Sequence, residues 1–172
     1  ENGYQVIYRP HPMTLRYRQK LLAELQEKFK QNKNFIYETN LSSQESLHIS
    51  NIMITDWSGV AIEYALGIEH PVIFIDLPRK VNNPEYKKIP FEPFEVTIRS
   101  KIGVVIPPNR LRDIPKNIED LCSNFDSFSQ EIRKIRSENV YNLGASGATG
   151  ASYIVQIAKP NRANELTTDP QI

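Results

Sequence analysis

Two short clusters contain the residues best suited to bind phosphate. The first is Arg9-Pro10-His11-Pro12, where a guanidinium that can bind a diphosphate by its fork precedes an imidazole that can accept or donate a proton. The second is Thr55-Asp56-Trp57-Ser58-Gly59, where hydroxyls and backbone N–H groups can hold an anion. Together the clusters predict a site for a phosphate-bearing ligand.

Each cluster also has an ordinary structural explanation. An isolated loop histidine such as His11 is commonly satisfied by a backbone carbonyl, but the neighbouring Arg9 and two rigid prolines favour a functional role here. Thr55, Asp56 and Ser58 are common helix N-caps. The two interpretations are compatible, because a capping side chain leaves other N–H groups free. The second cluster is neither a GxGxxG motif nor a P-loop.

Three charged residues near these clusters are weaker candidates. Glu63 can reach a ribose or acceptor hydroxyl, or it can be a solvated helix residue. Arg79 and Lys80 lie on a proline-rich loop and can close over a charged substrate or remain solvated. The sequence has no zinc-ligand spacing, no G-x-S-x-G elbow and no flavin or NAD motif, so we expect no metal and no cofactor.

The hydrophobic pattern places both clusters beyond the ends of buried strands. Apolar runs predict strands at 4–8, 35–37, 52–54, 71–75 and 103–106. Helical spacing predicts helices at 15–30, 43–50, 60–67 with Gly67 as C-cap, 94–101, 111–122, 128–141 and 151–158. Strands that alternate with helices are typical of an α/β fold with a Rossmann-like parallel sheet and helices on both faces. Ligands bind beyond the carboxyl ends of such strands, so we expect both clusters on one rim.

Composition and length limit the classes of protein to consider. The 172 residues include 21 lysines and arginines and 20 aspartates and glutamates, so the net charge of +1 makes no case for nucleic-acid binding. No apolar run approaches the ~20 residues of a membrane span, and a single Cys122 excludes an internal disulfide. We expect one nucleotide-binding domain over residues 1–158, a flexible glycine-rich junction at 144–150 within it, and a polar, disordered tail over 159–172. The sequence begins without Met, so we expect an excised fragment, although removal of an expression tag would leave the same start.

Three blocks of the sequence resemble the CDP-glycerol glycerophosphotransferase family of teichoic-acid and capsule synthesis. They are Arg9-Pro10-His11-Pro12, the stretch from Ile54 to Tyr64, and Pro71-Val72-Ile73-Phe74. The resemblance implies a GT-B architecture of two Rossmann-like halves, of which this chain is similar to the C-terminal, donor-binding half. The N-terminal half is expected to carry a second histidine of the active site. This half is not in the chain, and we expect it as a binding partner.

The resemblance also implies a reaction and a set of site residues. An acceptor hydroxyl attacks the β-phosphorus of a CDP-linked alditol and CMP leaves. His11 corresponds to the catalytic histidine, as acid/base or as diphosphate ligand. The turn that contacts the donor diphosphate in the family corresponds to Thr55, Ser58 and Gly59. Arg9, Asp56 and Glu63 are further donor-binding candidates from their residue types and positions. Gly59 stands where many members have a second serine, which leaves the donor's identity open between glycerol, ribitol and a sugar.

The same resemblance implies where such an enzyme acts. The acceptor is lipid-linked or polymeric, the location is the cytoplasm at the inner face of the cell membrane, and any peripheral membrane contact is made by parts outside this chain. The isolated half is expected to be inactive. Two alternatives remain: a GT-B glycosyltransferase that uses a nucleotide sugar, with Glu63 on the ribose, or a non-catalytic nucleotide-binding module.

Overall fold

The computed structural model describes residues 3–79, 81 and 83–158, which belong to two compact units. Unit 1 comprises residues 1–133 and unit 2 comprises residues 134–172. The predicted polar tail, 159–172, and the candidate residue Lys80 lie outside the described residues. The assignment of 1–158 to a single domain therefore stays a prediction.

The first strands of unit 1 form a parallel ladder of their own. β1 (Val6–Tyr8) pairs with β2 (Phe35–Tyr37), and Ile7 lies opposite Ile36. The connection carries α1 (Pro12–Tyr17) and α2 (Gln19–Phe29). The single helix expected at 15–30 is wrong, because Arg18 leaves helical geometry at φ −128° and ψ 36° and separates the two. A break of one residue barely changes the apolar spacing, so the pattern could not reveal it.

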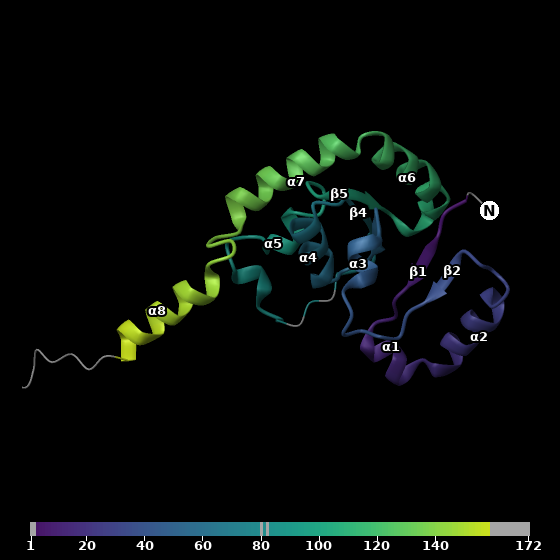
Figure 1. Cartoon of the computed structure of the whole chain (residues 1–172), viewed down its shortest axis with the longest axis horizontal. Helices are drawn as coiled ribbons and strands as arrows, with labels where there is room; N and C mark the ends of the chain where they lie inside the picture. Colours follow the sequence, from purple (N-terminus) through teal and green to yellow (C-terminus); the bar gives the residue numbers. More distant parts are fainter. Residues whose placement is uncertain (1–2, 80, 82, 159–172) are drawn as a thin grey trace, which may run out of the picture. The chain divides into compact units, whose positions relative to one another are not determined.

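A second parallel ladder follows in the order β3-β4-β5. It contains β3 (Met53–Thr55), β4 (Val72–Ile75) and β5 (Gly103–Ile106). The parallel α/β class with flanking helices is thus confirmed (Figure 1). The strands form two separately hydrogen-bonded ladders in the described part of the chain, where one sheet was expected.

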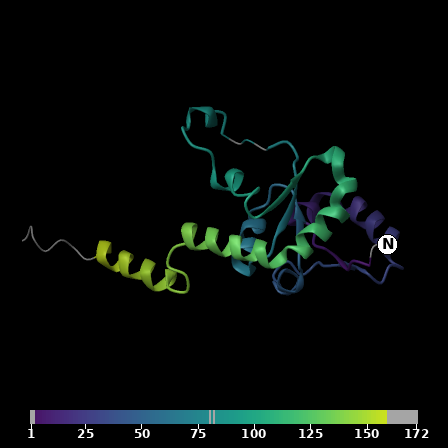
Figure 2. The same ribbon diagram turned by 90° about the horizontal axis from the view of Figure 1, so that it is seen from above.

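Both faces of β4 are covered, which positions the loops at its carboxyl end. Ile73 clusters with Ile106 and Leu121, under α6 (Ile114–Ser123) and the start of α7 (Phe125–Asn139). Successive strand residues point to opposite faces, so Val72 and Phe74 face the other side. Figures 1 and 2 show α6 beside β4 and β5, with α4 on a different side of these strands. Continuous apolar burial is typical of a parallel strand covered on both faces.

The remaining elements of unit 1 are short. They are α3 (Glu45–Ile49), α4 (Gly59–Ile68), η1 (Tyr86–Lys88), α5 (Phe94–Thr97) and η2 (Pro108–Asp113). The expected C-cap at Gly67 is wrong: α4 ends at Glu69, which has φ 65° and donates its N–H to the Ala65 carbonyl. The Glu69 carboxylate accepts two hydrogen bonds from Arg133, at 3.0 and 2.6 Å.

Unit 2 contains the C-terminal end of α7 and the whole of α8 (Ser146–Ala158). The glycine-rich stretch 144–150 was expected to be a flexible junction, but α8 begins at Ser146 and includes Gly147 and Gly150. Only Gly144, with φ 72°, lies before the helix in a conformation that favours glycine. Among the described residues, no helix is both long enough and apolar enough to cross a membrane.

Candidate ligand-binding site

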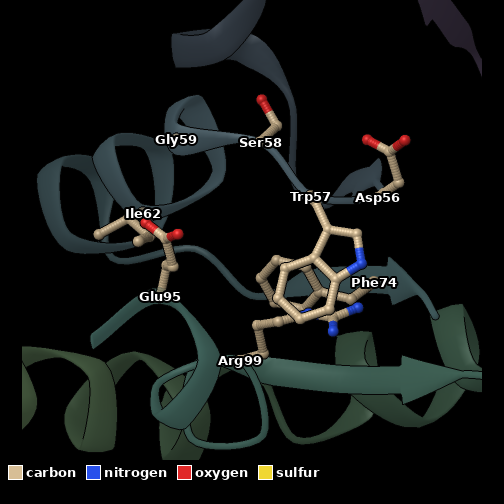
Figure 3. Close-up of a pocket in the computed structure, with 8 residues that line it drawn as sticks. All are labelled: Asp56, Trp57, Ser58, Gly59, Ile62, Phe74, Glu95 and Arg99. Atoms are coloured by element: carbon tan, nitrogen blue, oxygen red, sulfur yellow. The ribbon is translucent and has the colours of Figure 1, made fainter. Parts of the chain in front are cut away.

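A pocket of about 100 Å³ opens beside the turn between β3 and α4. Figure 3 shows the side chains that surround it, which come from this turn, from α4, from β4 and from the segment around α5. The lining residues are Asp56, Trp57, Ser58, Gly59, Ile62, Phe74, Glu95 and Arg99. The predicted candidates Asp56, Ser58 and Gly59 therefore share one pocket with residues that lie far away in the sequence.

Ser58 is the N-cap residue of α4 but does not cap it with its side chain. Its backbone is extended, at φ −136° and ψ 128°, and its hydroxyl accepts no hydrogen bond from the first turn. Ala61 donates its N–H to the Ser58 carbonyl at 3.1 Å. The N–H groups of Gly59 and Val60 have no acceptor among the described residues. These donors and the positive end of the helix macrodipole can hold an anion.

Gly59 provides open space at the start of α4. A Cβ atom built on it meets no atom within 4 Å, and its φ is not positive. Glycine is therefore not required here by the protein's own packing. Its absence of a side chain leaves the backbone N–H accessible to a ligand.

Arg99 was not predicted from the sequence, yet it is the cation of this pocket. Its guanidinium carbon lies 3.8 Å from the ring centroid of Trp57 and 5.0 Å from that of Phe74. Nη1 donates to Oδ1 of Asp76 at 3.0 Å. The sequence offered no signal that singles out Arg99, because Lys101 lies between the same apolar residues, Ile98 and Ile102, and is exposed.

Trp57 forms a wall of the pocket. Its indole Nε1 donates to the Leu77 carbonyl at 2.7 Å, which ties the β3–α4 turn to the end of β4. Figure 3 shows the indole lying over the guanidinium of Arg99. The ring is thus held by one hydrogen bond and by a cation–π contact.

The pocket contains carboxylates as well as N–H groups and a cation that could hold an anion. Asp56 and Glu95 line it, and both are exposed residues. Carboxylates accept hydrogen bonds from hydroxyl and amino groups and repel phosphate. The arrangement therefore suits a ligand that combines an anionic group with hydroxyl or amino donors, as a nucleotide or an alditol phosphate does. The described residues contain no cluster of potential ligands that could hold a metal ion.

Arg9 is largely engaged by the protein itself. Its Nη1 donates to the Glu38 carboxylate at 3.1 Å and to the Ser43 carbonyl at 2.7 Å, and Nη2 donates to the Leu41 carbonyl at 2.6 Å. Ser46 completes the group by donating its hydroxyl to Glu38. In this structure Arg9 organises the segment after β2, and its diphosphate-binding role stays a prediction.

His11 is the N-cap of α1 and is exposed. Its Nδ1 accepts a hydrogen bond from the Met13 N–H at 3.1 Å. A neutral imidazole that accepts at Nδ1 carries its proton at Nε2. Nε2 makes no hydrogen bond within the described part of the chain and can donate to a ligand. His11 follows β1, in the other ladder, and does not line the pocket around Arg99.

The other candidates also lie outside this pocket. Thr55 ends β3 and is half-buried, and Glu63 is exposed on α4. Arg79 forms an ion pair with Glu92 at 3.2 Å and lies 5.9 Å from the ring centroid of Tyr86. Their binding roles, like that of His11, stay predictions.

Comparison with protein families finds a match in the N-terminal part of unit 1. Residues 1–80 match the model of the CDP-Glycerol:Poly(glycerophosphate) glycerophosphotransferase family. The resemblance that the three sequence blocks indicated is thereby confirmed. The match supports a transferase activity of the glycerophosphotransferase type. The matched segment includes both clusters that the sequence predicts to bind phosphate, but it ends before Glu95 and Arg99. No curated protein and no solved structure matches the chain at a significant level.

Proposed function

We propose that this chain binds a CDP-linked alditol, CDP-glycerol in the first instance, as the donor half of a glycerophosphotransferase. The observation that carries the proposal is the family match over residues 1–80. The matched segment includes the turn that opens α4 beside the pocket, at Ser58 and Gly59. The free N–H groups of that turn would hold the diphosphate.

The proposed reaction is a phosphoryl-centred substitution. The oxygen of an acceptor hydroxyl attacks the β-phosphorus, which bears the glycerol. The bond from this phosphorus to the bridging oxygen breaks, and CMP leaves with that oxygen. A phosphodiester forms between the acceptor and the glycerol, and the hydroxyl proton passes to a base or to solvent. Electrostatic stabilisation of the charge on the phosphates would supply most of the catalysis.

The hydrogen-bond donors and the carboxylates of the pocket would contact different parts of the donor molecule. The N–H groups at Gly59 and Val60 would neutralise phosphate oxygens, while Asp56 and Glu95 would accept hydrogen bonds from hydroxyl groups or from the cytosine amine. A preference for a nucleotide over bare phosphate would follow, because the carboxylates repel an anion that offers no donor in return.

The hydrogen bond at Nδ1 of His11 favours a role as a diphosphate ligand over a role as a base. While Nδ1 accepts from the Met13 N–H, Nε2 carries the proton and cannot accept one. Donating this hydrogen bond to a phosphate oxygen keeps the cap intact. Acting as a base would require the other tautomer and would break the cap.

The wider setting belongs to the same proposal. The acceptor would be a lipid-linked or polymeric alditol phosphate of a teichoic-acid-like or capsular polymer. A second, N-terminal GT-B half would complete the cleft, so the isolated chain would bind donor without turning it over. Such an enzyme would work at the inner face of the cell membrane.

Calorimetric titration of the chain is the direct test. We expect CDP-glycerol and CDP to bind, and UDP-glucose and UDP to bind at least tenfold more weakly. Gly59→Asp places a carboxylate where the phosphate would lie, and should weaken CDP binding by at least tenfold. Gly150→Asp in α8 is the matched control, since a Cβ at Gly150 also meets no atom within 4 Å. Preference for a uridine nucleotide, or unchanged binding by Gly59→Asp, would overturn the proposal.

A further inference from the structure

The guanidinium of Arg99 is buried with only part of its hydrogen-bonding capacity used. The residue is 6% exposed. Nη1 donates to Asp76 at 3.0 Å, but Nε and Nη2 are buried and have no hydrogen-bond partner among the described residues. Buried N–H groups of a charged side chain are costly when unpaired, so they are rare outside functional sites. This group therefore requires an explanation.

The ion pair with Asp76 does not explain why Nε and Nη2 are left unpaired. The Asp76 side chain is 50% exposed, while that of Arg99 is 7% exposed. A half-solvated carboxylate that contacts one nitrogen leaves the remaining face of the fork available to another acceptor. The guanidinium itself lies close to the rings of Trp57 and Phe74 (Figure 3).

The position of Trp57 connects this guanidinium to the N-terminus of α4. Trp57 immediately precedes Ser58 and Gly59 in the chain, and all three residues line the same pocket as Arg99. The ring is held over Arg99 by the cation–π contact and by one hydrogen bond to the Leu77 carbonyl. Movement of this side chain away from Arg99 would uncover a guanidinium that lines the same pocket as the free N–H groups of the turn.

We propose that Arg99 is a phosphate-binding residue of this pocket and that Trp57 covers it until a phosphate group enters. The inference rests on the proposed function, because it assigns Arg99 to the diphosphate of the same ligand. A phosphate oxygen accepts from Nε and Nη2, while the N–H groups at Gly59 and Val60 hold another oxygen. The residue thus adds to the donor site a cation that lies outside the segment matching the family.

The chain provides its own probe for this step. Trp57 is the single tryptophan of the sequence, so the intrinsic fluorescence of the 172-residue chain reports on the indole over Arg99. Inorganic pyrophosphate and CDP are the ligands to titrate, with calorimetry in parallel. We expect a saturable change in emission with both ligands, because the ring leaves the guanidinium.

Two variants and a control test the residue itself. Arg99→Lys keeps the charge but removes the fork, and should weaken binding of pyrophosphate and CDP at least tenfold. Asp76→Asn removes the competing carboxylate, and should strengthen pyrophosphate binding at least threefold. Arg112→Lys, at an exposed position of η2, should bind like the wild type. Circular dichroism establishes that each variant is folded.

The outcomes separate this inference from the proposed function. If the folded Arg99→Lys binds both ligands like the wild type, Arg99 is only structural and the inference is overturned while donor binding stands. If Arg99→Lys does not fold, Asp76→Asn decides, and an unchanged pyrophosphate affinity overturns the inference. If Arg99 variants lose pyrophosphate but the wild type prefers uridine nucleotides, the proposed function fails and the inference stands. Binding of neither ligand by the wild type overturns both.

Discussion

The guanidinium carbon of Arg99 lies 3.8 Å from the centroid of the Trp57 indole, and only Trp57 falls within the segment that matches the family. The contact joins the β3–α4 turn to the segment that enters β5. The turn that opens α4 is therefore supported by a part of the chain whose sequence the family model does not describe.

The first prediction concerns the hydrogen bond that holds Trp57. Trp57→Phe keeps an aromatic ring over Arg99 but removes the Nε1 donor to the Leu77 carbonyl. We expect the free energy of unfolding to fall by about 1 kcal/mol, measured by urea denaturation. Phe91→Leu is the control, because that ring is 73% exposed, and it should change stability by less than about 0.5 kcal/mol. An unchanged stability in Trp57→Phe would show that the bond contributes nothing.

His11 allows its capping role and its ligand role to be separated. His11→Ala removes the acceptor for the Met13 N–H, and should cost about 1 kcal/mol of stability. His11→Asn supplies a good N-cap oxygen and should restore most of that stability. If Nε2 binds the diphosphate, both variants should bind CDP more weakly than the wild type. Recovery of CDP affinity by His11→Asn would contradict the ligand role and leave only the cap. The measurements are urea denaturation and calorimetry with CDP.

Much of the fold could be predicted because the strands of a buried parallel sheet are short apolar runs. The bounds of β2 and β5 agree with the predicted 35–37 and 103–106. The division of the strands into two ladders could not be predicted, since it depends on which edges pair and apolar runs alone do not encode pairing. The break at Arg18 was missed for the related reason that one non-helical residue hardly alters a helical stripe.

The candidate site, too, could be predicted only where its residues are neighbours in the sequence. The turn at Ser58 and Gly59 was found because a strand that changes to helical spacing through small polar residues is visible locally. Arg99 was not found, because its contact with Trp57 exists only once β4 and β5 are paired side by side. Arg9 was judged by its residue type alone, and its bonds to Leu41 and Ser43 depend on the segment that follows β2.

Gly103 is a position where the packing of β5 requires glycine. A Cβ atom there would lie 1.7 Å from the carbonyl oxygen of Val72, its partner residue in β4. Backbone cannot move out of the way cheaply, so Gly103→Ala should destabilise unit 1 by about 3 kcal/mol or more. Gly67→Ala is the matched control: Gly67 lies inside α4 and its Cβ would meet no atom within 4 Å.

The control, Gly67→Ala, is expected to change the free energy of unfolding in the opposite direction. Alanine in a helix interior is more favourable than glycine, so Gly67→Ala should stabilise by roughly 0.5–1 kcal/mol. Both changes are read from urea denaturation curves. Similar effects of the two substitutions would contradict the close approach of β4 and β5 at Gly103.

Tyr64 couples the stability of unit 1 to alkaline pH. The ring is 1% exposed, and its hydroxyl donates to the Ser50 carbonyl at 2.7 Å. Burial raises the pKa of the Tyr64 phenol far above its ordinary value of 10.0. The folded state therefore keeps this proton when the unfolded state has lost it. Stability from this group is fully present below about pH 10 and is lost as pH rises above it, by up to about 1.4 kcal/mol per pH unit.

Replacing the phenol tests this assignment of the alkaline transition. Tyr64→Phe should cost about 1 kcal/mol at neutral pH, because the Ser50 carbonyl loses a donor. His70 Nδ1 lies 2.8 Å from the same carbonyl and keeps it hydrogen-bonded. Above pH 10 the variant should lose stability less steeply than the wild type, and the two curves should converge. Tyr17→Phe, at a ring that is 61% exposed, controls for removal of a phenol. Urea denaturation from pH 7 to pH 11 is the measurement, and an equally steep decline in Tyr64→Phe would exclude Tyr64 as the titrating group.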